Sequence, residues 1–475
     1  MELRLPENTD ARELLTAHFD VRPGPVTRAV ATFYDTFDGR LNGEGVTLRH
    51  KEGRLTLLDR ETGEELAAAE STAAKRFFDY ELPEALRAAL ADVIEMRALL
   101  PVARLRAERR GFAVLNEDAK TVVRLYAEHG RLTATAVKGY EGELDRVRET
   151  LALEEATVPL VDEAIVADGG DPAGISSKLA LTLNPEAPAD VAAARVFKRL
   201  LEVIDLNLPG TLDDVDSEFL HDLRVAVRRS RSLQRQFKAV YTDRLQHHRD
   251  EFKRLQAVTG DLRDLDVYLL DFPDLQASLP EKMRADLDPL RGVLETRRTR
   301  ALTATRRALR AQRTGDALAD WSEFVTAQKP AEKTVKELAS HRITQVYRKM
   351  VKMGKAIDDD SPADDLHELR KVGKELRYLL EFFASLYPAD VVKPFVKTLK
   401  GLQDQLGRFQ DREVQANALR ELAPAVSGHP FTLMAMGVLV ERFMQEEIAA
   451  RAEFADRFAV FASKEQRDIV KETFA

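Results

Sequence analysis

The sequence predicts an α+β unit with a mainly antiparallel sheet, followed by an all-α helical bundle made of two pseudo-symmetric repeats. Three observations predict this architecture. Short strand-like runs separated by turns fill residues 1–183. Long segments with 3.6-residue periodicity, rich in Ala, Leu, Arg, Lys and Glu, fill residues 191–475. Within the second region two segments recur at nearly one spacing, which predicts an internal repeat.

The first region carries its β-branched and aromatic residues in short runs. Turn signals such as Asp38-Gly39 and Glu52-Gly53 separate these runs. Strands are expected at 26–34, 46–48, 54–58, 121–126 and 131–136, and helices at 11–19 and 83–97. Residues 141–143 are expected to form a loop that leads into a helix.

A linker is expected at 184–190, where Pro185 and Pro188 flank Glu186 and Ala187. The first domain is therefore 1–183 and the helical domain 191–475, with repeat 1 at about 191–330 and repeat 2 at about 335–475. Pro, Gly and Asn predict helix breaks at 207–210, 271–273, 358–362, 387–388 and 428–430.

Composition excludes several classes of site. The chain of 475 residues is long enough for two or three domains. It has no cysteine, which rules out disulfides, Cys-ligated zinc and thiol nucleophiles. No window approaches the ~20 apolar residues of a membrane helix, and the N-terminus lacks the pattern of a secretory signal. We therefore expect no membrane partner and a cytoplasmic location.

Charge is distributed unevenly. The net charge is -8, yet residues 1–185 hold 24 Lys and Arg against 33 Asp and Glu, and residues 186–475 hold 48 against 47. Neither part is basic enough to predict nonspecific DNA binding. An anion site would have to arise from local clustering.

The internal repeat is carried by matched segments. His221-Asp222-Leu223-Arg224 and His367-Glu368-Leu369-Arg370 lie 146 residues apart. The run 252–256, followed by Gly260, Asp264 and Val267, matches 399–403, followed by Gly407, Asp411 and Val414, at a spacing of 147. Two matches at nearly one offset predict two related multi-helix units.

Each repeat presents a stripe of cations on one helix face. At 100° per residue, the cationic members of each helix fall within roughly 80°, opposite an apolar face. The members are His221, Arg224, Arg228, Arg231 and Arg235 in the first repeat, and His367, Arg370, Lys374 and Arg377 in the second. Like charges at this spacing repel by a few tenths of a kcal/mol per pair, and a bound anion would turn that cost into affinity. The planar fork of Arg suits phosphate.

Further cations at stripe-like spacing complete the candidate anion site: Lys198, Lys253, Arg348, Lys352, Lys355 and Lys400. Two plainer interpretations stay open. A cationic stripe can be a solvated helix face, and a histidine at a helix start can be a structural hydrogen-bonding group. The arginine run at 297–310 is expected to be an exposed face.

These segments resemble the two halves of a CHAD domain, the conserved-histidine α-helical domain. The resemblance covers about 191–475 and is looser in the second half, where Gln410 and Glu413 stand for Arg263 and Asp266. It implies a helical bundle with internal two-fold symmetry whose basic groove binds inorganic polyphosphate. By this resemblance the groove would be lined by His221, Arg224, Arg228, Arg231, Lys253, His367, Arg370, Lys374, Arg377 and Lys400. The resemblance also implies association with polyphosphate granules.

The first region is similar to a CYTH domain, the triphosphate tunnel fold, in segments 33–41, 46–49, 101–106 and 176–178. The resemblance implies a tunnel-like or barrel-like sheet, with Arg104, Arg106 and Arg110 alternating on one strand face and pointing inward. Active members open on a Glu-x-Glu-x-Lys strand that binds a divalent metal. Here that strand is Glu2-Leu3-Arg4-Leu5-Pro6, with a single acid. One carboxylate is a poor site for the metal that triphosphate chemistry needs, so we expect a degenerate, non-catalytic tunnel.

Three functions are therefore weighed. The first is a polyphosphate-binding protein with no cofactor, no metal and no catalytic residue. The second is a metal-dependent triphosphatase in the first region, with the helical domain gathering substrate. The third is RNA or other nucleic-acid binding, which the scarcity of aromatic residues on the cationic arc disfavours.

Overall fold

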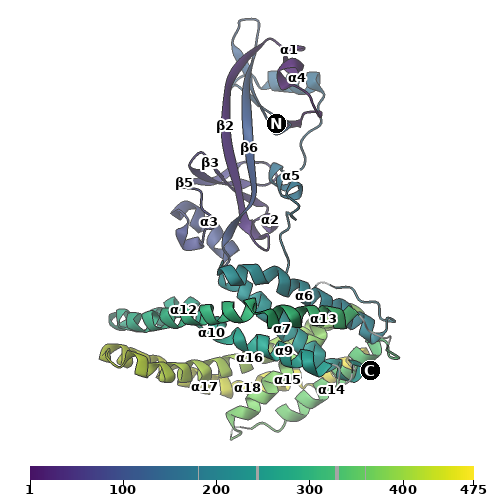
Figure 1. The fold of residues 1–475 in the computed structure, drawn as a ribbon, viewed down its shortest axis with the longest axis vertical. Helices are drawn as coiled ribbons and strands as arrows, with labels where there is room; N and C mark the ends of the chain where they lie inside the picture. Colours follow the sequence, from purple (N-terminus) through teal and green to yellow (C-terminus); the bar gives the residue numbers. More distant parts are fainter. Residues whose placement is uncertain (180, 242–244, 327–330, 359, 475) are drawn as a thin grey trace. The chain divides into compact units, whose positions relative to one another are not determined.

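The structure is a computed structural model that describes residues 1–179, 181–241, 245–326, 331–358 and 360–474 (Figure 1). Its internal contacts divide the chain into two compact units, Met1–Ser177 and Lys178–Ala475, which are described separately below. The domain and repeat bounds drawn from the sequence stay a prediction. The expected end of repeat 1, at 327–330, lies outside the described residues.

The first unit is α+β, as predicted. Its strands are β1 (Glu2–Arg4), β2 (Val21–Thr36), β3 (Val46–Lys51), β4 (Arg54–Asp59), β5 (Glu65–Glu70), β6 (Leu99–Leu115), β7 (Thr121–Glu128) and β8 (Arg131–Ala136). Its helices are α1 (Ala11–Thr16), α2 (Arg40–Gly43), α3 (Glu84–Ile94), α4 (Glu141–Leu151) and α5 (Leu160–Ala167), with a short 3₁₀ helix η1 (Asp79–Glu81). β5 lies outside the expected strands, because its run of three alanines has low β propensity and gains its place by pairing with β4.

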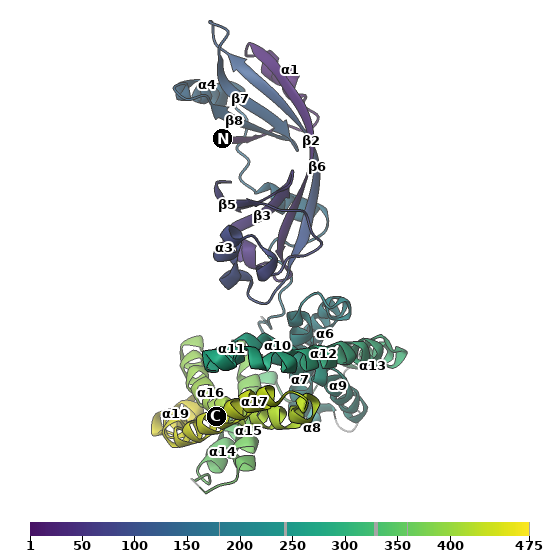
Figure 2. The ribbon, with the colours of Figure 1, turned by 90° about the vertical axis from the view of Figure 1, so that its left-hand side faces the viewer.

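One antiparallel sheet in the order β1-β8-β7-β6-β2-β3-β4-β5 forms the centre of this unit. The long strands β2 and β6 pair from Val21↔Val114 to Thr36↔Leu99 and connect two separate cores (Figure 2). One core packs α1 and α4 against β7 and β8, and the other packs α3 against β3 and β4. Gly24 on β2 lies close to the backbone of Gly111 on β6. A Cβ atom at position 24 would lie 3.1 Å from the carbonyl carbon of Gly111, so a side chain there would crowd the neighbouring strand.

Within the described residues the sheet is not closed, although its antiparallel order is consistent with the expected tunnel-like sheet. In the described residues β1 and β5 are the two edges, and neither pairs with the other. β1 has only three residues in the ladder, too few to cross a barrel seam. Its outer edge is instead covered by a single bridge between Leu3 and Glu155.

The second unit is helical throughout, as predicted. Its helices are α6 (Ala189–Asp213), α7 (Ser217–Gln236), α8 (Lys238–Tyr241), α9 (Gln246–Val258), α10 (Gly260–Leu270), α11 (Phe272–Ser278), α12 (Asp288–Arg310), α13 (Gln312–Thr326), α14 (Val335–Gly354), α15 (Ala363–Phe382), α16 (Ala389–Leu422), α17 (Pro430–Ala452), α18 (Phe454–Phe461) and α19 (Lys464–Thr473). Short 3₁₀ helices are η3 (Glu281–Met283), η4 (Ala285–Leu287), η5 (Ala384–Leu386) and η6 (Ala423–Val426). Both repeated segments are helical, while the two-fold symmetry stays a prediction.

Two main hydrophobic cores hold this unit together. The larger joins α6, α7, α9, α13, α14, α15, the first half of α16, α18 and α19. The smaller joins α11, α12, the second half of α16 and α17. Only α16, with 34 residues, contributes a long stretch to both.

Most helix breaks fall where Pro, Gly and Asn predict them, but the break at 207–210 is wrong. Helix α6 continues through Pro209 to Asp213. Proline removes one intrahelical hydrogen bond, and packing against α7 compensates for it. Gly210 is buried against the ring of Phe219, and Thr211 Oγ1 donates to the carbonyl of Asn207 at 2.9 Å.

Across the described residues, no helix combines the length and the apolar character that crossing a bilayer would require.

The contact between Gly210 and Phe219 predicts a large effect of a small substitution. A Cβ at Gly210 would lie 2.2 Å from Phe219 Cδ1, so Gly210→Ala should destabilise the helical unit by about 1–3 kcal/mol through overpacking. Gly292→Ala on α12 is the control, because its Cβ would meet open space and alanine favours a helix by up to about 1 kcal/mol. Thermal unfolding followed by circular dichroism measures both, and equal melting temperatures would contradict the packing argument.

Candidate anion-binding site

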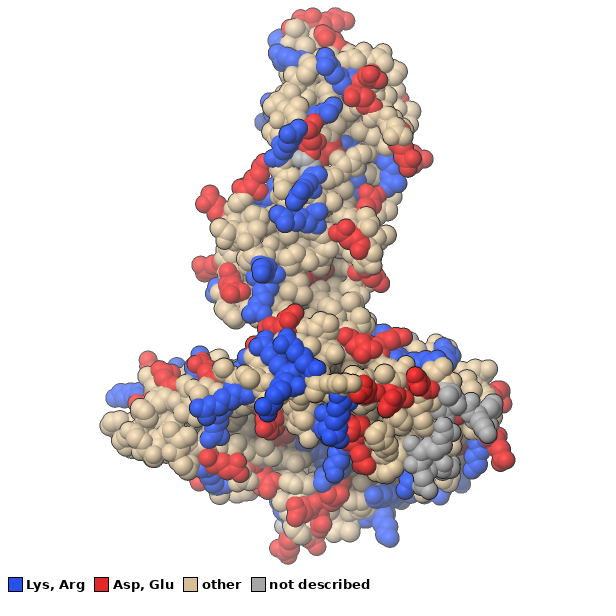
Figure 3. Space-filling view, viewed as in Figure 1, with Lys and Arg blue, Asp and Glu red and all other residues tan. Residues whose placement is uncertain are grey.

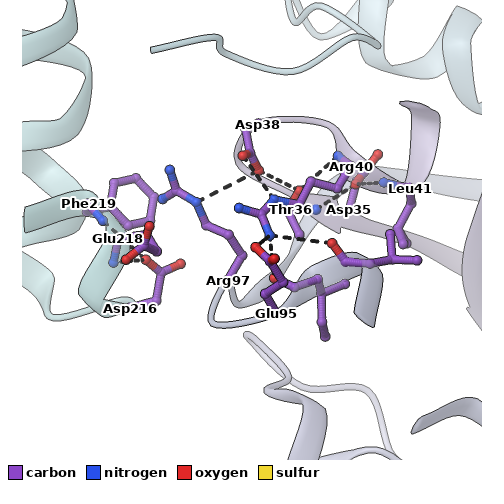
Figure 4. Close-up of polar contacts among 12 residues, drawn as sticks. Asp35, Thr36, Asp38, Arg40, Leu41, Glu95, Arg97, Asp216, Glu218 and Phe219 are labelled. Carbon is purple, nitrogen blue, oxygen red and sulfur yellow. Dashed lines mark hydrogen bonds and ion pairs between the residues drawn. The ribbon is translucent and has the colours of Figure 1, made fainter. Parts of the chain in front are cut away.

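The two predicted basic segments lie on α7 and α15, whose apolar backs are buried. The residues on these backs are Leu223, Ala226 and Leu233 on α7, and Leu369, Val372 and Leu376 on α15, each at most 4% exposed. At the start of α7 the Asp216 carboxylate accepts hydrogen bonds from the backbone N–H groups of Glu218 (2.9 Å) and Phe219 (3.2 Å) (Figure 4). This N-cap sets where α7 begins and therefore which of its side chains face away from the core.

Lys374 marks the place where the two basic helices meet. Burial first, and then repulsion by Arg370, Arg228 and Arg377, together lower its pKa to about 8, although attraction from Asp411 opposes the shift. Arg228 belongs to α7 and the other two arginines to α15, so the two cationic faces converge here. Among the described residues Lys374 forms no ion pair within 4.0 Å.

Two equivalent arginines are anchored to the following helices. Arg224 Nη1 donates to Thr259 Oγ1 at 2.8 Å, and burial lowers the pKa of Arg224. Arg370 Nη1 donates to Gln410 Oε1 at 2.7 Å, and its Nη2 lies 3.2 Å from Asp411 Oδ1. These contacts fix both guanidinium groups while leaving further N–H donors for a ligand.

The two histidines occupy different surroundings. Burial lowers the pKa of His221, although Glu218 opposes the shift, so the free imidazole is neutral near pH 7. His367 Nε2 instead lies 2.8 Å from Glu413 Oε2, and its Nδ1 is 3.9 Å from Asp364. His367 therefore fits the interpretation of a structural hydrogen-bonding group, whereas His221 can take up a proton beside an anion.

Two glutamates of α15 pair with basic side chains and hold neighbouring helices together. Sequence inspection overlooked Glu381, although it lies four residues after Arg377, the spacing of an intrahelical ion pair. The pairs are Arg235–Glu375 (3.7 Å), Arg342–Glu375 (3.4 Å), Arg229–Glu381 (3.0 Å) and Arg377–Glu381 (3.3 Å). Arg235 and Arg377 are thus partly neutralised, and Arg229 ties α7 to α15.

The remaining predicted cations lie in three kinds of place. Arg231, Arg235 and Lys253 line a hollow of about 250 Å³ between α7 and α9. Arg348 lines a separate hollow of about 810 Å³ beside His341 and Phe474, so the structure does not bring it to Lys374. The exposed side chains of the other four, Lys198, Lys352, Lys355 and Lys400, make no ion pair within the described part of the chain.

Three cations near these groups were missed from the sequence. Arg249 lines the hollow with Arg231 and Lys253. Arg342 contacts Glu375, and Lys349 contributes, after Lys371, to the lowered pKa of Glu368. Arg342 and Lys349 are seven residues apart and therefore share a face of α14. This spacing in the sequence could have identified both cations.

The charge surface of the helical unit mixes both signs. Figure 3 shows Lys and Arg side chains gathering near the middle of one face, with Asp and Glu around them. Because residues 186–475 have a near-zero charge balance, an anion site there requires local clustering of cations. Figure 3 shows such clustering on this face.

The first unit also has a hollow, of about 1060 Å³, on the concave side of its sheet. Arg49, Lys51 and Arg109 line it, opposed by Glu128, which lies 3.4 Å from Lys51 and 3.9 Å from Arg109. Within the described residues no cluster of three or more His, Asp or Glu is arranged to hold a metal ion.

Glu2, the single acidic residue of β1, already forms an ion pair with a buried arginine. Arg131, 3% exposed, lies 3.1 Å from Glu2 and 2.6 Å from Glu163. Glu2 therefore neutralises a buried guanidinium, a structural task that competes with metal binding.

The arginines expected to point into a tunnel point the other way. Arg104, Arg106 and Arg110 share one face of β6, as alternation predicts, but all three are exposed. The hollow is lined instead by Leu105 and Arg109, which occupy the opposite face.

In the first unit, a polar cluster fixes the turn between the end of β2 and the start of α2. Arg40 lies 3.1 Å from Asp38 and 2.7 Å from Glu95, and Asp35 accepts from the backbone N–H groups of Leu41 and Thr36 (Figure 4). These groups satisfy one another, so the cluster is a structural device.

Comparison with known proteins gives four findings. Residues 195–420 match the family described as the CHAD domain. The chain is similar to the crystal structure of the CHAD domain from the plant Ricinus communis, at 24% identity and a TM-score of 0.51, covering 59% of this chain and 94% of that one. It is also similar to PptA from Streptomyces chartreusis, at 18% identity and a TM-score of 0.46, covering 57% and 99%. No curated protein sequence matches. The likeness to the Ricinus communis structure shows a shared helical fold.

The lowered pKa of Lys374 predicts a pH-dependent stability difference. Its pKa in the folded chain, about 8, lies below its ordinary 10.5, so the penalty for holding the charged amine is present below pH 8 and disappears as pH rises towards 10.5. Lys374→Met should therefore raise the melting temperature at pH 7 by about 2–4 °C, with a smaller gain at pH 10.

Lys397→Met is the matched control, since Lys397 is an exposed lysine on α16. Thermal unfolding of both variants against the parent protein at pH 7 and pH 10 gives the comparison. A gain for Lys374→Met that is equal at the two pH values would contradict the assignment.

Proposed function

Residues 195–420 of this chain are a CHAD domain, and from that premise we propose that the protein binds inorganic polyphosphate along the cationic faces of α7 and α15 and associates with polyphosphate granules. CHAD domains are associated with polyphosphate binding. The chain's own residues support the same ligand, because they place several fixed cations along two adjacent helices.

The convergence at Lys374 is the observation that carries the proposal. Arg228, Arg370 and Arg377 lie close enough to Lys374 to lower its pKa by charge repulsion. Such repulsion is unfavourable in the free protein, and a chain of phosphate groups would relieve it at every step. Arginine supplies paired donors to each phosphoryl group, and His221 adds a donor once it is protonated.

Nucleic acid fits the same surface less well. Binding to single-stranded RNA gains about 1–3 kcal/mol for each base that stacks on an aromatic ring. The aromatic residues of α15 and the end of α7, Tyr378 and Phe237, are at most 4% exposed, so they offer no stacking face. Phosphate contacts alone would remain for a nucleic acid.

Titration of long-chain polyphosphate into the full-length protein tests the proposal. The double variant Arg228→Ala/Lys374→Ala should bind at least tenfold more weakly, and its affinity should fall less steeply with salt, because fewer counterions are released. Arg457→Ala, an exposed arginine on α18, is the control. Unchanged binding by the double variant, or equal affinity of the parent protein for single-stranded RNA at physiological salt, would overturn the proposal.

We also propose that the first unit is not a triphosphatase, because Glu2 is paired with Arg131. Incubation with tripolyphosphate and Mg²⁺ should release no more free phosphate from the parent protein than from a Glu2→Ala variant. Metal-dependent release that Glu2→Ala abolishes would show that the carboxylate retains a catalytic task.

A further inference from the structure

A small hollow lies between α7 and α9. Its volume is about 250 Å³, below the range of roughly 300–1,000 Å³ typical of drug-sized ligands. Its described lining is almost wholly polar, and comprises Arg231, Gln234, Arg235, Gln246, Arg249, Asp250 and Lys253.

The charges in this hollow are unbalanced. Four cations line it against the single carboxylate of Asp250, which leaves three positive charges uncompensated within the lining. Asp250 itself accepts from Gln246 Nε2 at 3.1 and 3.2 Å. Burial lowers the pKa of Arg231, and repulsion by Arg235 and Arg249 lowers it further. At the rim, Glu375 lies 3.7 Å from Arg235, too far for a strong hydrogen bond.

A buried amide completes the lining. Gln234 is 0% exposed, and neither its Nε2 nor its Oε1 has a hydrogen-bond partner in the described residues. A buried polar group without a partner costs about 1–3 kcal/mol, and natural proteins rarely leave one without a reason. An NH₂ donor among four cations is a suitable partner for a phosphoryl oxygen.

The second repeat carries a partly different set of residues at the matching positions. At an offset of 146, Gln234 and Arg235 correspond to Leu380 and Glu381. At an offset of 147, Arg249 corresponds to Val396, whereas Lys253 keeps a basic counterpart in Lys400. Leu380 is buried in the core, and Glu381 pairs with Arg377. The buried amide of Gln234 and the cation Arg249 therefore have no counterpart at the matching positions of the second repeat.

We propose that the hollow binds the terminal pair of phosphates of a polyphosphate chain, or a free diphosphate of the same chemistry. The size admits one or two phosphoryl groups but not a folded length of chain. A terminal phosphate carries more negative charge than an internal one, because only the terminal group has a second ionisable oxygen, as in a phosphate monoester at about −1.5 to −2. The surplus of positive charge in the lining therefore favours the end of the chain. The inference rests on the proposed function and deepens it by assigning the end of the polymer to this hollow.

Calorimetric titration of the full-length protein with diphosphate, with inorganic phosphate as the reference ligand, tests the hollow directly. The parent protein should bind diphosphate at least tenfold more tightly than monophosphate. Arg249→Ala and Gln234→Leu should each weaken diphosphate binding about tenfold or more. Gln234→Leu introduces the side chain found in the second repeat, and circular dichroism checks that it folds. Arg300→Ala, an exposed arginine on α12 outside the hollow, should bind diphosphate as the parent does.

Long chains with capped ends separate the two sources of the ligand. Polyphosphate whose terminal phosphates are converted to amides should bind the parent protein several-fold more weakly than the unmodified polymer, and Arg249→Ala should not distinguish the two polymers. Equal binding of capped and uncapped chains by the parent protein would overturn chain-end recognition.

The outcomes also separate this inference from the proposed function. Binding of long-chain polyphosphate without binding of diphosphate would refute the proposed site in the hollow but not the proposed polyphosphate site along α7 and α15. Diphosphate binding that Arg249→Ala and Gln234→Leu do not weaken would place the site elsewhere. Failure of the parent protein to bind either long-chain polyphosphate or diphosphate would refute both proposals.

Discussion

Repulsion among the cations of α7 and α15 is the constraint on which the helical unit depends. Two unit charges 4 Å apart repel by about 4 kcal/mol at an effective dielectric constant of 20, so the helices that carry Arg228 and Lys374 need other interactions to stay together. Burial supplies most of these, because each buried Leu or Val contributes roughly 1.5–3 kcal/mol and the backs of both helices lie in one core. Arg229 and Glu381 add an ion pair across the two helices. The cationic faces are thus held close by interactions on the opposite sides of the same helices.

The sequence predicts the helices of the site well and their mutual contacts poorly. Periodicity depends only on local geometry, so α7 and α15 appear where their apolar and basic faces predict them. Which cations meet depends on how each helix is rotated against its neighbours, and no single-helix pattern contains that angle. For α14 the spacing of Arg348, Lys352 and Lys355 suggested one face, whereas Arg342 is the side chain that reaches Glu375. Pro209 likewise predicts a helix end that tertiary packing overrides.

The first unit shows the same division between local and long-range information. Turn dipeptides and alternation predict most of its strands and place Arg104, Arg106 and Arg110 on one face. Whether that face points inward depends on which way the sheet curves, and here it points outward. Closure depends on the length and register of the edge strands, and β1 is too short to meet β5. The pairing of Glu2 with Arg131 crosses 129 residues of sequence, a separation at which local patterns carry no information.

The long helix α16 links two cores that otherwise share few residues. In the first repeat the corresponding stretch is interrupted at Thr259, between α9 and α10. All the candidate anion-binding residues lie on helices of the larger core, and none lies on α11, α12 or α17. A polyanion bound there stabilises the larger lobe by mass action and leaves the local opening of the smaller lobe unchanged. In the liganded protein, amides of α12 and α17 would then exchange with solvent well before those of α7 and α15.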